Sequence, residues 1–114
     1  MSIDEFRKLA LSFEESEEMP HFEKPSFRIK KKIFATLHAD SNKYVLKLDL
    51  INQQVFMGIN SKGIYPVKGA WGKQGWTIFE LEDLPEELVY DALSIAYCIV
   101  APKKLAEKYH TNNF

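Results

Sequence analysis

The sequence predicts an α+β domain of two layers, in which helices cover an antiparallel five-stranded sheet, in the order α-β-β-β-α-β-β-α with a short final helix. Apolar residues recur every three or four positions near both ends of the chain, as in amphipathic helices, but alternate with polar residues through its middle, as in strands. The connections between the middle strands are too short for a crossover helix, so neighbouring strands are expected to be antiparallel. At 114 residues the chain can form one core but not two, so we expect a single domain over residues 1–114.

Helices are expected at both ends of the chain. The first runs from Ile3 to Phe13, with Ser2 as its N-cap and Glu5 completing a capping box. An acidic run over residues 14–18 follows, and two prolines within residues 19–25 predict an extended, turn-rich connection. The strongest helix is expected to start at Asp83, with Pro85 in its first turn, and Pro102 separates it from a short helix over residues 103–109. Its predicted buried stripe consists of Leu88, Ala92, Ile95 or Ala96, and Ile99.

The middle of the chain has the alternation that is typical of strands. Strands are expected to begin at Ser26 and over residues 33–37, 44–50, 64–67 and 76–80. A tight hairpin turn is predicted at residues 30–32 and further turns at residues 40–42 and 60–63. Asp49 or Asn52 can cap a short helix over residues 53–57, which ends at Gly58. Residues 68–75 are expected to form a flexible loop.

Several classes of function find no support in the residues. His21, His38 and His110 are far apart in sequence and the only cysteine is Cys98, so neither a metal site nor an internal disulfide is expected. Cys98 is predicted to be a small buried thiol within the last long helix. We therefore expect a protein that has no cofactor and is not an enzyme. Because no secretory signal or apolar membrane span is visible, we also expect a cytoplasmic protein.

The charge distribution is the feature that points to a partner. The net charge is −1, but residues 24–79 contain ten basic and two acidic residues, a net charge of +8, and the rest of the chain sums to −9. A solvated basic face that discourages aggregation is one interpretation. The other is a polyanion-binding sheet face, on which two basic turns straddle a nucleic-acid backbone.

The second interpretation identifies candidate contact residues. Trp71 or Trp76 can stack on exposed bases, although Trp76, at the start of a strand, is the more suitable of the two for a place in the core. Because phosphate contacts carry no base identity, we expect little sequence specificity. The basic residues proposed to contact phosphates are Lys24, Arg28, Lys30, Lys31, Lys32, Lys68 and Lys73.

Several short motifs, in order along nearly the whole chain, resemble the MmcQ/YjbR family. They are PHFEKPSFR at residues 20–28, KIFATL at 32–37, GIYP at 63–66, GWT at 75–77, and Ala96-Tyr97 followed by VAPKKL at 100–105. The resemblance implies an antiparallel sheet covered by helices, similar to type III secretion chaperones, and DNA binding through a double wing of two hairpin-like projections. The family motif falls on His21, Lys24, Pro25, Ser26, Phe27 and Arg28, and on Trp76, so Ser26 joins the candidate DNA contacts. Glu23 stands where the family frequently has glycine.

Two alternatives to DNA binding remain open. The fold resemblance and the contrast between an acidic helical face and a basic sheet suggest a protein-interaction or chaperone-like module, although we expect a monomer. The other alternative is a small anionic-ligand binder in which Arg28 binds a carboxylate or phosphate and His21, beside Ser26, acts as an acid or base.

Overall fold

The computed structural model describes residues 1–109, with the side chain of Asp83 left out, and contains both helices and strands. Its elements in chain order are α1 (Ile3–Leu11), β1 (Glu17–His21), β2 (Lys24–Ile29), β3 (Lys32–His38), the 3-10 turn η1 (Ala39–Ser41), β4 (Lys43–Lys47), α2 (Leu50–Ile59), β5 (Ile64–Pro66), α3 (Ala70–Lys73), β6 (Trp76–Glu80), the 3-10 turn η2 (Leu81–Asp83), α4 (Glu86–Val100) and α5 (Lys103–Ala106).

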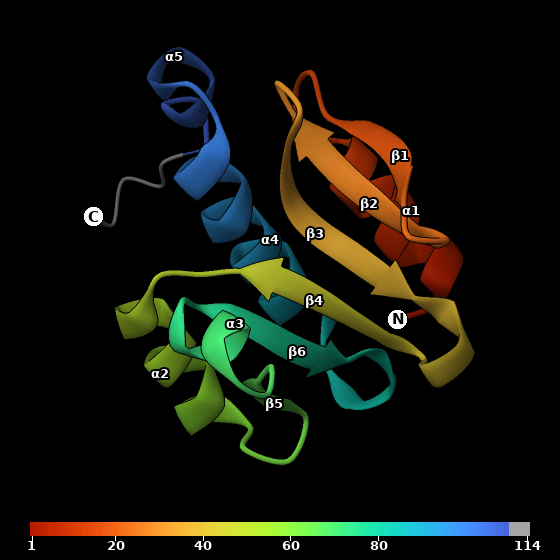
Figure 1. Cartoon of the computed structure of the whole chain (residues 1–114), viewed down its shortest axis with the longest axis vertical. Coiled ribbons are helices and arrows are strands. Elements are labelled where there is room, and N and C mark those ends of the chain that lie inside the picture. Colours follow the sequence, from red (N-terminus) through yellow and green to blue (C-terminus); the bar gives the residue numbers. More distant parts are fainter. Residues whose placement is uncertain (110–114) are drawn as a thin grey trace.

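The strands form one antiparallel sheet in the order β1-β2-β3-β4-β6-β5. Figure 1 shows α1 behind β2, and α4 behind β3 and β4, in a second layer. The predicted α+β architecture is therefore confirmed, and the sheet has six strands rather than five. No helix within residues 1–109 has the length and apolarity needed to cross a membrane.

Alternate residues of the sheet face the helices and form the core. Phe27, Leu37, Leu46 and Phe79 are fully buried, and Phe6 of α1 packs its ring against Tyr44 of β4 at 4.4 Å between centroids. Helix α4 contributes five buried apolar side chains, Val89, Ala92, Leu93, Ala96 and Tyr97, and the buried Ser94. The predicted stripe contained Ala92 and Ala96 but was rotated too far around the helix, because Ile99 is 41% exposed.

The helix caps are local features, and most of them follow the sequence. Ser2 and Glu5 form the predicted capping box at the start of α1. Asp49 caps α2 through the backbone N–H of Asn52, and this helix is longer than the predicted residues 53–57. Helix α4 begins at Glu86, after Pro85 at the N-cap position, and not at Asp83 as predicted.

Strand β1 is the element that the sequence analysis missed. It occupies residues 17–21, which were predicted to be an extended, turn-rich connection, and pairs with β2 from Glu17 opposite Arg28 to His21 opposite Lys24. Its first four residues are exposed, so the alternation that marks a half-buried strand is missing. Pro20 has no N–H to donate, which is tolerated because β1 lies at the edge of the sheet.

The segment predicted as a flexible loop over residues 68–75 contains the short helix α3 and is closely packed. A Cβ atom at Gly72 would lie 1.8 Å from the carbonyl oxygen of Val67, and one at Gly75 would lie 1.7 Å from that of Leu48. Gly75 also has a φ of +108°. These two glycines allow the backbone to approach its neighbours, so they mark a compact connection and not a mobile one.

Candidate nucleic-acid interface

The helices α1, α2 and α4 all pack on one face of the sheet, through contacts such as Phe6 with Phe27 and Phe56 with Phe79. The residues that alternate with these core positions lie on the opposite face, which we call the open face. Most of them are partly exposed, as are Thr36, Val45 and Ile78. In an antiparallel sheet, directly opposed residues share a face, so the strand register decides which of these side chains are neighbours.

Four basic side chains form a row across the open face, which we call the basic row: His21, Lys24, His38 and Lys43. His21 is opposite Lys24, and His38 is opposite Lys43. The pairing of Ser26 with Thr36 places Lys24 beside His38. Neighbouring strands lie about 4.8 Å apart, so the row spans roughly 14 Å over β1 to β4.

The charges of the basic row are close enough to affect one another. Burial lowers the pKa of His38, and the nearby ammonium groups of Lys24 and Lys43 lower it further, while the carboxylate of Asp40 acts in the opposite direction. Among the described side chains, neither Lys24 nor Lys43 has a carboxylate oxygen within 4.0 Å. Glu80, which lies directly opposite Lys43 on β6, accepts a hydrogen bond from the Tyr65 hydroxyl at 2.8 Å. The row therefore contains two ammonium groups, Lys24 and Lys43, that are in no ion pair among the described side chains, and a lowered pKa favours the neutral form of His38 between them.

Arg28 lies on the same face and is fixed by two hydrogen bonds. Its Nε donates to the Ser26 hydroxyl at 2.9 Å and its Nη2 donates to the Pro20 carbonyl at 3.3 Å. Ser26 donates in turn to the Met19 carbonyl at 2.6 Å and is fully buried. Ser26 is therefore not a direct contact as predicted, and instead positions Arg28. No hydrogen bond described for the chain joins Arg28 to His21.

The two tryptophans meet at the other end of the open face. The Trp71 and Trp76 rings lie edge to face with centroids 6.0 Å apart, and Lys47 places its Nζ 5.9 Å from the Trp76 ring centre. Trp76 is half-buried, whereas Trp71 is 60% exposed. Gln53 of α2 fixes the α3 segment, because its buried amide donates to the Gly72 carbonyl at 3.0 Å. Trp71 is thus the more available of the two rings.

The two predicted basic turns lie at one end of the sheet. Lys30 and Lys31 form the tight turn between β2 and β3, while Lys68 and Lys73 lie in the connection between β5 and β6. The β2–β3 and β5–β6 connections are on either side of the end of β4, where Lys47 lies. Lys31, Lys32, Lys68 and Lys73 are exposed.

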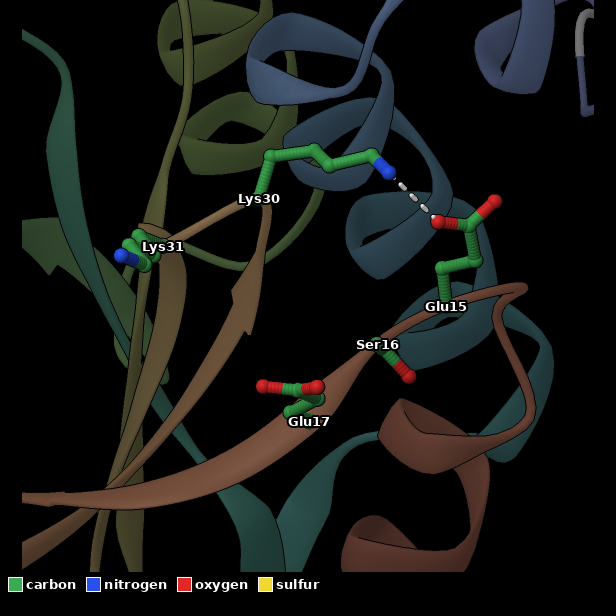
Figure 2. A pocket seen from close by; sticks show the side chains of 5 residues that line it. All are labelled: Glu15, Ser16, Glu17, Lys30 and Lys31. Carbon is green, nitrogen blue, oxygen red and sulfur yellow. Dashed lines mark ion pairs between the residues drawn. The ribbon is translucent and has the colours of Figure 1, made fainter.

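Carboxylates offset part of the charge at the β2–β3 turn. A cleft of about 380 Å³ separates this turn from the segment between α1 and β1, and it is lined by Glu15, Ser16, Glu17, Lys30 and Lys31. In Figure 2, Lys30 extends toward Glu15 while Lys31 points away from it. The Nζ of Lys30 lies 2.8 Å from Oε1 of Glu15. Lys30 is therefore less available to a phosphate than its position in the sequence suggested.

Phe22 is an exposed residue at the edge of the site that the sequence analysis did not select. It forms the turn between β1 and β2 with Glu23, and its side chain is 87% exposed. Phe22 and Glu23 have φ values of 49° and 71°, and the Phe22 ring contacts His21 at 4.6 Å between centroids. Such a backbone suits Asn-Gly rather than Phe-Glu, so the residues of this turn carried no local signal for it.

The other chemistries considered from the sequence gain no site. Within residues 1–109 there is no group of three or more His, Cys, Asp and Glu side chains placed to hold a metal, and His110 lies outside the described residues. Cys98 is half-buried rather than fully buried, and burial raises the pKa of its thiol. A thiol of raised pKa is a poor nucleophile near neutral pH.

The comparisons with known proteins agree on a family and a fold. The family model described as YjbR matches residues 11–99. The chain is similar to the crystal structure of the Deinococcus radiodurans protein DR2400, of the domain family DUF419, with a TM-score of 0.78 and 20% sequence identity over 95% of this chain and 87% of that chain. No curated protein matches the chain.

Proposed function

The chain belongs to the YjbR family, and we propose that this member is a non-enzymatic DNA-binding protein with little sequence preference. It contacts phosphates through the open face of its sheet, aided by the basic turns at one end. The observation that carries the proposal is the basic row, which places Lys24 and Lys43 on either side of His38. Glu80 lies opposite Lys43, but among the described side chains no carboxylate oxygen is within 4.0 Å of either ammonium group. A chain of phosphates would neutralise these two ammonium groups and favour the protonated form of His38.

The architecture favours contact with the DNA backbone over recognition of base sequence. The cations lie on strands and tight turns, and α3, the helix within the β5–β6 connection, has only four residues. Lysine and arginine contacts to phosphates position a protein on DNA but carry no sequence information. Lys47 and Arg28, which hydrogen bonds hold in place, add positive charge between the basic row and the two tryptophans, and Glu17 opposite Arg28 offsets part of it.

A charge-matched pair of variants tests the proposal. The variant K24Q/K43Q/K47Q removes three cations from the open face, and K8Q/K103Q/K104Q removes three exposed lysines from helices, so both change the net charge equally. Anisotropy of labelled DNA of about 12 nucleotides, single-stranded and duplex, should show binding at about 50 mM salt. The open-face variant should bind roughly tenfold more weakly or worse, and the helix variant should bind like the unaltered protein.

The salt dependence gives an independent check. If Lys24, Arg28, Lys43 and Lys47 each neutralise one phosphate, the plot of log K against log salt should have a slope of roughly −2.8 on single strands and −3.6 on duplex. No binding of either form of DNA, or equal weakening by the two triple variants, would contradict the proposal.

A second candidate function, a protein-interaction module, has support from a different surface. Helix α2 contains no charged residue, and four of its apolar side chains are more than half exposed: Leu50, Ile51, Val55 and Ile59. Exposed apolar patches often mark protein contacts. Light scattering over a range of concentrations would test for association with a second copy, and the variant I51E should abolish any dimer that uses this helix.

A further inference from the structure

Phe22 is placed in a way that folding alone does not explain. A two-residue turn with positive φ at both positions suits Asn-Gly, yet the β1–β2 turn consists of Phe22 and Glu23. The ring is 87% exposed, and the one aromatic contact described for it is with its neighbour His21. A large apolar side chain is thus held in solvent on a strained backbone, a situation that is found at functional sites.

The surroundings of Phe22 indicate what its ring can bind. The residues on either side of the turn, His21 and Lys24, form the first cross-strand pair of the basic row. A flat apolar surface therefore lies next to a row of basic side chains in which Lys24 and Lys43 are in no ion pair among the described residues, although the exposed Glu23 shares the turn with Phe22. A nucleotide has this combination of groups, because its base offers a flat face and its phosphate a negative charge.

We propose that the open face binds single-stranded DNA in preference to duplex, with an unpaired base stacked on Phe22 and the adjoining phosphates on the basic row. This inference rests on the proposed function and specifies the form of DNA. The row spans roughly 14 Å, enough for at most about four phosphates at the spacing along one strand of a duplex. Trp71, exposed at the far end of the open face, offers a second ring to the same strand.

Duplex DNA fits this arrangement less well. Its bases stack on one another, so Phe22 can reach a base face only after a step has been unstacked. A single strand presents its base faces freely, and aromatic side chains beside a basic groove are the common means of binding it. The preference should therefore depend on the Phe22 ring, whereas attraction to the phosphates should not.

The test uses three probes of equal length: an oligothymidylate, an abasic oligomer that keeps the phosphates but lacks bases, and a duplex. The full chain should bind the oligothymidylate at least about fivefold more tightly than the abasic oligomer, and more tightly than the duplex. The variant F22A should bind the oligothymidylate no better than the abasic oligomer, and its affinity for the abasic oligomer should not change. F22W should retain the preference.

The matched control is Ile51→Ala on α2, which removes another highly exposed apolar side chain, 77% exposed. It should leave binding of all three probes unchanged. Unchanged urea midpoints would show that F22A is folded. If the duplex binds as tightly as the oligothymidylate, or if F22A keeps the preference, the inference is overturned while DNA binding stands. If none of the probes binds, the proposed function itself fails.

Discussion

Replacing Tyr44 with phenylalanine should make the protein more stable. Tyr44 lies fully buried on β4, with its ring stacked on Phe79 at 5.0 Å and tilted against Phe6 at 4.4 Å. Among the described side chains, its hydroxyl is the one buried group that has no hydrogen-bond partner. Burial also raises the pKa of this phenol well above its usual value, which reflects the same loss of hydration. Phenylalanine would keep the stacked ring and remove the unpaired hydroxyl.

The magnitude follows from the price of an unpaired buried polar group, about 1–3 kcal/mol. The small void left by the missing oxygen offsets part of this, so we expect the free energy of unfolding to rise by about 1 kcal/mol. In a domain of this size such a gain corresponds to a rise in Tm of about 4 °C.

The assay is urea denaturation with thermal unfolding as a second measurement, and Tyr97 provides the matched control. Tyr97 is also fully buried, but its hydroxyl donates to the Glu14 carbonyl oxygen at 2.6 Å. Y97F should therefore lower stability by about 1 kcal/mol. Both variants should keep the urea m-value of the unaltered protein. If Y44F is destabilised as Y97F is, the hydroxyl of Tyr44 has a partner and the reasoning is refuted.

Two further predictions concern His38 and Gly75. Because the pKa of His38 is lower in the folded state than in the unfolded state, the folded state binds fewer protons. The contribution of His38 to stability is therefore present above about pH 6.5 and is lost as the pH falls through the lowered pKa. Over this pH range the urea midpoint of H38N should fall less than that of the unaltered protein, and equal falls would contradict the argument. G75A should destabilise by more than about 2 kcal/mol, because its Cβ would meet the Leu48 carbonyl at 1.7 Å and its φ is +108°. The control G58A, with nothing within 4 Å of its Cβ, should stabilise α2 by about 0.5–1 kcal/mol, as measured by thermal unfolding; similar effects of the two substitutions would contradict the packing argument.

Features that depend on neighbouring residues in the sequence were predictable. The capping box at Ser2 and Glu5 and the strand over residues 76–80 are encoded by short patterns, and the structure has both. The phase of α4 was harder to predict, because its stripe contains several apolar residues and the sheet decides which of them are buried. Strand β1 carried no such pattern, since an exposed edge strand is defined by backbone pairing with β2 and not by burial.

The composition of the candidate site depended on pairings that are distant in sequence. The excess of basic residues over positions 24–79 predicted a basic sheet. The basic row itself exists because β3 brings His38 between Lys24 and Lys43. The ion pair between Lys30 and Glu15 joins the β2–β3 turn to the connection between α1 and β1. Counting lysines in the sequence therefore overestimated the unpaired positive charge of the β2–β3 turn. Ser26 matched the family motif, yet its role in holding Arg28 is visible only in three dimensions.

Helices α1, α2 and α4 pack on one face of the sheet. Residues that alternate along each strand therefore serve two different purposes, one set stabilising the core and the other forming the open face. Changes at the buried positions, such as Leu46, alter the stability of the domain, whereas changes at their neighbours, such as Val45 and Lys47, alter what the surface attracts. A chain of this design can acquire a new ligand by substituting every second strand residue without refolding. The same property makes the domain a practical scaffold for engineering, because a library restricted to the open face leaves its core intact.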